Sequence, residues 1–169
     1  MIQLIRKPLP ALALALLGLV LLQAQPGVAT AQDDGVHRVV YHADFSDPRR
    51  FSAMLTSIHN MVTYYENQLA DYDVRIVFVA HGIRFVTDDA LESTPFATDA
   101  ALEERRENLK GRLSALNETR GVKLELCDIT RKEIGLAEDN LYPAVEMVPS
   151  GVVRIAELQR QGFSYIKVE

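Results

Sequence analysis

Two hydrophobic periodicities alternate along this chain. Residues 37–42 are rich in β-branched and aromatic side chains, which predicts a first strand. A helix is expected next, because Asp47 and Pro48 supply a capping oxygen and a first-turn proline. Its apolar positions recur at steps of three and four: Phe51, Met54, Leu55, Ile58, Val62, Tyr65 and Leu69. Residues 74–80 are apolar apart from Arg75, which predicts a second strand covered on both faces.

The second half of the chain continues the alternation. Residues 82–98 form a long irregular stretch around Pro95, which is typical of a lid or an interface segment. The pattern then predicts a helix between Asp99 and Gly121, strand 122–126, helix 130–137, strand 145–148, a helix from Gly151 to Gly162 and strand 163–168.

Alternating strands and helices of this length predict an α/β fold with a mostly parallel five-stranded sheet. We expect a three-layer α/β/α sandwich, either flavodoxin-like or Rossmann-like, with helices on both faces. The pattern leaves the order of the strands in the sheet open.

The first 31 residues have the composition of a signal peptide. Arg6 and Lys7 precede an uncharged apolar run over 11–22, and small residues at 29–31 follow as a cleavage site. The run is shorter than the roughly 20 residues that span a bilayer. We therefore expect residues 1–31 to be removed on export to the periplasm, with residues 32–169 forming one α/β domain. An uncleaved N-terminal anchor is the alternative.

The net charge of the chain restricts the classes of partner that it is expected to bind. The formal net charge is −5 and becomes more negative once Arg6 and Lys7 are removed, which argues against a nucleic-acid partner. No stable membrane span is expected after cleavage. Neither a glycine-rich dinucleotide motif nor a P-loop occurs, so the sequence predicts no cofactor.

The chemistry-bearing residues follow predicted strands. Ligands bind at the carboxyl ends of strands in an open parallel sheet. His42 ends the first strand, His81 and Gly82 follow the second, Cys127 follows the third, and Ser150-Gly151 opens a helix after the fourth. We expect these residues to share one edge, with Cys127 and His81 as candidate catalytic residues. The expected binding residues are His42, Gly82, Arg131, Ser150 and Gly151.

Cys127 is the only cysteine of the chain, so it has no partner for a disulfide within the chain. Its thiol is either reactive, with a pKa lowered by Arg131 or by a helix N-terminus, or a small apolar side chain that closes a core strand. A zinc site built from His42, His81 and Cys127 is a further alternative, but no paired ligand spacing supports it, and we predict no metal.

In this order, Tyr41-His42, residues 79–82, Leu126-Cys127 and residues 148–152 resemble the DsrE/DsrF-like family, as does the closing segment 158–167. The similarity covers nearly all of residues 37–168 and is greatest to the small exported single-domain members. The resemblance implies a flavodoxin-like fold that assembles into homo-oligomers, often trimers or hexamers. It also implies that Cys127 is the position that would carry a persulfide, with His81-Gly82 nearby.

Three functions follow as hypotheses. The first is a sulfur carrier or sulfurtransferase-like protein that holds a persulfide on Cys127 and exchanges sulfur with a donor or acceptor protein. The second is a non-catalytic, oligomeric module that binds a small ligand or a partner, in which Cys127 is structural. The third is an intermolecular disulfide through Cys127. The sequence leaves open whether the chain is an enzyme.

Overall fold

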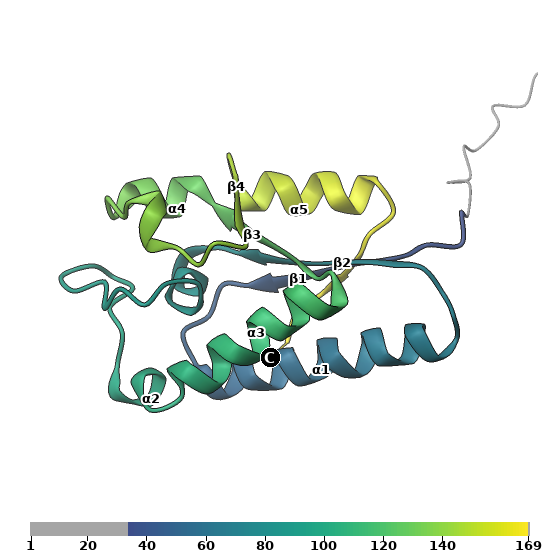
Figure 1. Cartoon of the computed structure of the whole chain (residues 1–169). Helices are drawn as coiled ribbons and strands as arrows, with labels where there is room; N and C mark the ends of the chain where they lie inside the picture. Colours follow the sequence, from purple (N-terminus) through teal and green to yellow (C-terminus); the bar gives the residue numbers. More distant parts are fainter. Residues whose placement is uncertain (1–33, 169) are drawn as a thin grey trace, which may run out of the picture. The chain divides into compact units, whose positions relative to one another are not determined.

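The computed structural model describes residues 34–168, and the predicted signal peptide lies outside this part of the chain. The elements alternate as the sequence pattern predicts (Figure 1). The strands are β1 (His37–Ala43), β2 (Tyr72–Phe78), β3 (Lys123–Cys127), β4 (Val145–Val148) and β5 (Ser164–Ile166). The helices are α1 (Pro48–Asn67), α2 (Ala100–Glu103), α3 (Arg106–Arg120), α4 (Asp128–Glu133) and α5 (Gly151–Arg160), with 3₁₀ turns η1 (Ala80–Phe85) and η2 (Glu138–Asn140).

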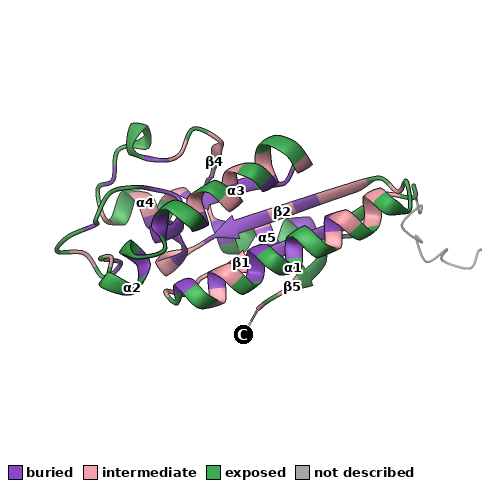
Figure 2. Ribbon diagram, turned by 60° about the horizontal axis from the view of Figure 1, so that its bottom comes forward, coloured by how far each residue is buried: buried purple, intermediate pink, exposed green. Residues whose placement is uncertain are grey.

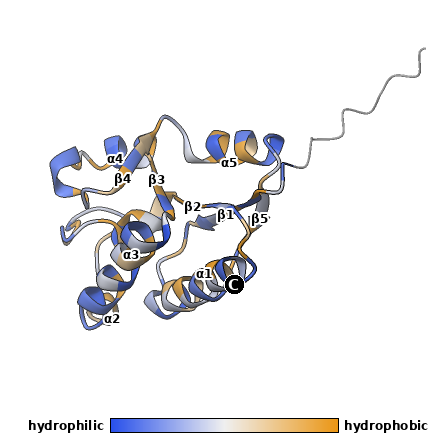
Figure 3. Ribbon diagram, turned by 45° about the vertical axis from the view of Figure 1, so that its right-hand side comes forward, coloured by the Kyte–Doolittle hydropathy of each residue, from blue (hydrophilic) through white to orange (hydrophobic). Residues whose placement is uncertain are grey.

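The five strands form one parallel sheet in the order β4-β3-β2-β1-β5. The chain therefore moves outward from β1 to β4 and then returns along α5 to place β5 on the other side of β1. Helices α1 and α3 cover one face of the sheet, and α5 covers the other (Figures 1 and 3). The predicted three-layer α/β/α architecture is confirmed, and the structure supplies the strand order.

The main core lies between the sheet and the pair α1 and α3. The α1 positions predicted from the helical repeat are buried there from Phe51 to Val62, and Asp47 caps the helix by accepting a hydrogen bond from the Arg49 amide at 2.8 Å. Both helices are buried on one side and exposed on the other (Figure 2). Burial of this apolar stripe is what attaches them to the sheet.

The core under α5 is smaller and partly ionic. It contains Val40, Val77, Ile155, Leu158 and Phe163. Beside these side chains, Glu125 of β3 accepts hydrogen bonds from Arg75 of β2 and Arg154 of α5. Arg75, the one charge inside the predicted second strand, is therefore accounted for by a buried carboxylate on the neighbouring strand.

Several boundaries differ from the sequence prediction, among them those of β2 and α4. Strand β2 starts at Tyr72 and ends at Phe78, because the chain turns into η1 immediately after Val79. The helix predicted over 130–137 begins at Asp128, directly after Cys127. The stretch over 82–98 is irregular as predicted, but it packs against the main core. Four of its side chains are buried there: Phe85, Val86, Leu91 and Phe96. Arg84 pairs with Asp99 at 2.6 Å, which joins the two ends of that stretch.

Candidate functional site

The carboxyl edge of the sheet brings the predicted residues to one region of the fold. Cys127 is the last residue of β3, and α4 starts at the next residue. Gly151 begins α5, and His81 and Gly82 lie in η1 after β2. Cys127 is 5% exposed, whereas Ile129 on α4 and Val152 on α5 are 58% and 61% exposed. The thiol is thus buried, next to helix starts that also carry exposed side chains.

The start of α5 packs directly against Cys127. A Cβ atom on Gly151 would lie 2.5 Å from Cγ2 of Val79 and 3.0 Å from Cβ of Cys127. No side chain fits in that space, so glycine is required for the helix to approach the strand ends this closely. The close approach places the backbone amide of Gly151 beside the sulfur.

The surroundings of Cys127 favour its thiolate. Burial raises the pKa of the thiol, but the backbone amides of Gly151, Thr130 and Ile129 and the hydroxyl of Thr130 lower it, and the net pKa is below the usual value. Cys127 occupies the N-cap position of α4 without making a capping hydrogen bond.

Thr130 links the thiol to the turn after β2. Its Oγ1 accepts a hydrogen bond from the Ala80 amide at 3.1 Å, and its hydroxyl faces Cys127. Ala80 has a φ of 49°, a left-handed conformation that is unusual for a residue with a Cβ. The hydrogen bond holds Ala80 in this conformation. It thereby fixes the start of η1, in which His81 is the next residue.

His81 and Gly82 form the part of η1 next to this turn. The His81 ring lies edge-on to Phe96, with centroids 5.2 Å apart, and its Nδ1 is buried without a hydrogen-bond partner in the described chain. A Cβ on Gly82 would lie 2.0 Å from the carbonyl oxygen of Ala43, so the close passage of η1 over the end of β1 demands glycine. Gly82 thus positions His81 through the backbone.

His42 lies at the same edge but in a separate group. Its Nδ1 is 3.0 Å from the hydroxyl of Tyr165, and its Nε2 is 3.9 Å from Asp44, which Lys167 also contacts. Burial lowers the pKa of His42, partly opposed by Asp44. Strand β2 separates His42 from Cys127, which puts their Cα atoms on the order of 10 Å apart. His42 therefore does not belong to the thiol's immediate surroundings.

Two further predicted residues have other contacts. Arg131 donates to Asp128 at 2.8 Å and to the Leu136 carbonyl at 2.6 Å, and it lies 3.3 Å from Glu138. Its charge is thereby engaged by Asp128 and Glu138. Ser150 is the N-cap residue of α5, and its side chain makes no capping hydrogen bond. Their roles in ligand binding stay predictions.

Two further observations concern metal binding and membrane crossing within the described residues. Residues 34–168 contain no group of three or more His, Cys, Asp and Glu side chains that could hold a metal ion, so His42, His81 and Cys127 do not form the zinc site considered above. No helix in the same range combines the length and the apolar character that a bilayer crossing needs.

The DsrE/DsrF-like family matches residues 39–168, which include β2 to β5 and all but the first two residues of β1. The chain belongs to the DsrE/DsrF-like family. The resemblance read from the motifs is thus confirmed over nearly the whole described region.

Two solved structures share the DsrE-like fold. The protein of unknown function MTH1491 from Methanobacterium thermoautotrophicum is 24% identical with a TM-score of 0.60, over 78% of this chain and 98% of its own. The ychN protein from E. coli is 15% identical with a TM-score of 0.51, over the same shares. Among curated proteins, none matches this chain significantly. At these identities the two structures establish the fold alone.

Some residues of this DsrE-like site escaped the sequence reasoning. Thr130 lies three residues after Cys127. In a helix that starts directly after Cys127, the side chain at this position lies next to the N-cap residue. This spacing is the signal in the sequence that could have identified Thr130. Phe96 beside His81 and Tyr165 beside His42 had no local signal, because each comes from a segment distant in sequence.

Proposed function

We propose that this DsrE-like protein carries sulfane sulfur as a persulfide on Cys127. The observation that carries the proposal is the set of donors around the sulfur: the Gly151, Thr130 and Ile129 amides and the Thr130 hydroxyl, which together lower the pKa of the thiol. A thiolate is the nucleophile in sulfur exchange, and a lowered pKa raises its population at neutral pH.

The transfer needs no external oxidant or reductant. The Cys127 thiolate attacks the outer sulfur of a donor persulfide, the new Sγ–S bond forms, the donor S–S bond breaks, and the donor thiolate leaves with the electron pair. An acceptor thiolate then attacks the outer sulfur on Cys127 and regenerates the Cys127 thiolate. His81, whose Nδ1 is buried without a partner, is assigned to deliver a proton to the leaving thiolate. The start of α5 stabilises the anion in place of Arg131, which is paired with Asp128.

We further propose that the mature protein acts in the periplasm as a homo-oligomer, a trimer or a hexamer, and exchanges sulfur with a donor or acceptor protein. The basic start, apolar run and small-residue site of residues 1–31 support export. Two sheet edges, β4 and the three-residue β5, support assembly, because an edge strand is readily covered by another copy.

The test is mass spectrometry of the intact protein after incubation with thiosulfate or inorganic polysulfide. The wild type is expected to gain one or more sulfur atoms that a reductant removes, and Cys127→Ser is expected to gain none. His81→Gln is expected to load and to pass sulfur to a small thiol more slowly. An unmodified wild-type Cys127, or an equal gain on Cys127→Ser, would overturn the proposal.

The alternative function is a non-catalytic oligomeric module that binds a small ligand or a partner. The observation in its favour is the 5% exposure of Cys127 and its contact with Gly151, which suit a packing role. On this alternative, Cys127→Ala keeps both the oligomeric state and the function in the cell. Loss of function in Cys127→Ala with an unchanged oligomer would exclude it.

A further inference from the structure

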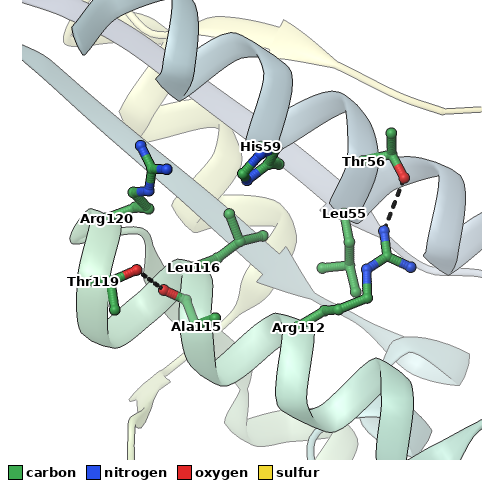
Figure 4. Close-up of a pocket in the computed structure, with 8 residues that line it drawn as sticks. All are labelled: Leu55, Thr56, His59, Arg112, Ala115, Leu116, Thr119 and Arg120. Atoms are coloured by element: carbon green, nitrogen blue, oxygen red, sulfur yellow. Dashed lines mark hydrogen bonds between the residues drawn. The ribbon is translucent and has the colours of Figure 1, made fainter.

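A hollow lies on the face of the sheet that α1 and α3 cover, away from α5 and Cys127. It is a pocket of about 370 Å³ between α1 and α3 (Figure 4). Leu55 of α1 and Leu116 of α3 are buried at its base, and Thr56, His59, Arg112 and Arg120 also line it. Nothing in the sulfur chemistry proposed above uses these residues.

Arg112 is held rigidly at one end of this groove. Its Nη1 donates to Ser52 Oγ at 2.6 Å, and its Nη2 donates to the Ser52 carbonyl at 2.9 Å and to Thr56 Oγ1 at 2.8 Å. A guanidinium has five N–H donors, so Nε–H and one N–H of Nη1 remain available. The bonds to α1 fix the orientation of those donors in advance, which reduces the entropy that binding costs.

Within the described residues, 34–168, the charge of Arg112 has no carboxylate counterion. Among residues 34–168 the structure gives it hydrogen bonds to hydroxyl and carbonyl oxygens and no carboxylate partner. Other partly buried arginines of the same region, such as Arg75, Arg84 and Arg154, each pair with a carboxylate. In an acidic chain, a fixed and uncompensated guanidinium beside a hollow is a site for an anion.

The other residues of the groove indicate which chemical groups the uncharged part of the anion should carry. Leu55 and Leu116 offer an apolar base between the helices. At the far end, Arg120 pairs with Glu66, which the Tyr72 hydroxyl also contacts. Arg112 and Arg120 are eight residues apart on α3, about 12 Å along the helix. In Figure 4 the His59 side chain lies between the helices on the Arg120 side, so this end is polar and unsuited to a cationic group.

We propose that the groove between α1 and α3 binds a small organic carboxylate, whose carboxyl group pairs with the Arg112 guanidinium and whose short apolar chain lies over Leu55 and Leu116. A carboxylate suits this site because one of its oxygens can accept the free Nε–H of Arg112, and its charge meets a guanidinium that has no carboxylate partner among residues 34–168. The apolar base then favours a chain of several carbons over a bare anion.

The probe is hexanoate, titrated into the full chain and followed by isothermal calorimetry or by amide NMR shifts of α1 and α3. Hexanoate is expected to bind at least tenfold more tightly than acetate, and hexylammonium is expected not to bind. Arg112→Gln is expected to weaken hexanoate binding about tenfold or more. Arg160→Gln on α5 removes the same charge from the other face and is expected to bind as the wild type does.

A second variant covers the case in which Arg112→Gln loosens α1. Ala115→Glu keeps every Arg112 hydrogen bond and places a carboxylate at the wall of the groove, where Ala115 is exposed. It is expected to abolish hexanoate binding while the protein stays folded. Equal binding of hexanoate and acetate, or wild-type binding by both variants, would overturn the proposal. Cys127→Ser is expected to bind hexanoate as the wild type does. The test of the carboxylate site is therefore independent of the test of the sulfur-carrier function.

Discussion

Arg154 on α5 donates two hydrogen bonds to the carboxylate of Glu125 on β3, from Nε at 2.7 Å and from Nη2 at 2.8 Å. The Glu125 side chain is 1% exposed, and Arg75 on β2 supplies a third bond at 2.8 Å. The pair therefore joins the helix that covers one face of the sheet to the two strands beneath it. Gly151, which lies next to Cys127, is the first residue of the same helix.

Removal of Arg154 is expected to destabilise the fold. In Arg154→Met the buried Glu125 keeps only Arg75, and breaking a buried pair of this kind costs roughly 2–3 kcal/mol when one partner remains. Urea unfolding followed by circular dichroism measures the change. Arg160→Met, an exposed position at the end of the same helix, is the control and should cost less than about 1 kcal/mol. Equal losses in the two variants would contradict a special role for the pair.

The Arg154–Glu125 pair also predicts that the free energy of unfolding depends on pH. Burial alone would raise the pKa of Glu125, but Arg154 and Arg75 lower it below its usual value of 4.5. A carboxyl whose folded pKa is depressed stabilises the protein above its unfolded pKa, and this contribution is lost as pH falls through the folded pKa. The difference in unfolding free energy between wild type and Arg154→Met should thus be largest near neutral pH and shrink below about pH 4.5. A difference that is constant across this range would refute the coupling.

The close packing of Gly151 gives a third prediction. In Gly151→Ala the new Cβ would meet Val79 and Cys127, which must shift α5 outward and cost about 1–3 kcal/mol. The Gly151 amide would also move away from the sulfur, so the pKa of the Cys127 thiol should rise. Gly111→Ala is the matched control, because nothing lies within 4 Å of its added Cβ in the middle of α3. That control should gain about 0.5–1 kcal/mol of stability in thermal unfolding.

A fourth prediction concerns Thr130. Loss of its hydroxyl in Thr130→Val removes one of the groups that lower the pKa of the Cys127 thiol. The rate of alkylation by iodoacetamide, followed against pH, should therefore shift to higher pH. Thr130→Ser keeps the hydroxyl and should retain the wild-type profile. Identical profiles for the valine and serine variants would show that the hydroxyl does not act on the sulfur.

The sequence predicted most of the architecture from local patterns. The apolar repeat of α1 from Phe51 to Val62, the strand over Val145–Val148 and the helix that begins at Gly151 all lie where the pattern places them, whereas Leu69 at the end of the predicted repeat lies beyond α1 and is exposed. Such elements are predictable because their burial depends on side-chain periodicity, which is a property of adjacent residues. The general rule for parallel sheets also placed His42, His81, Cys127 and Gly151 at one edge.

The environment of each candidate residue was decided by contacts between distant segments. The strand order sets β2 between β1 and β3, which separates His42 from Cys127, and the return of α5 over the sheet brings the Gly151 amide to the sulfur. Arg131 pairs with Asp128 within the same helix, whereas the contacts of Arg112 come from α1 and include no acid among residues 34–168. Whether a charge is paired or a thiol is activated depends on which side chains come into contact in the folded protein. Local periodicity contains no information about such tertiary contacts.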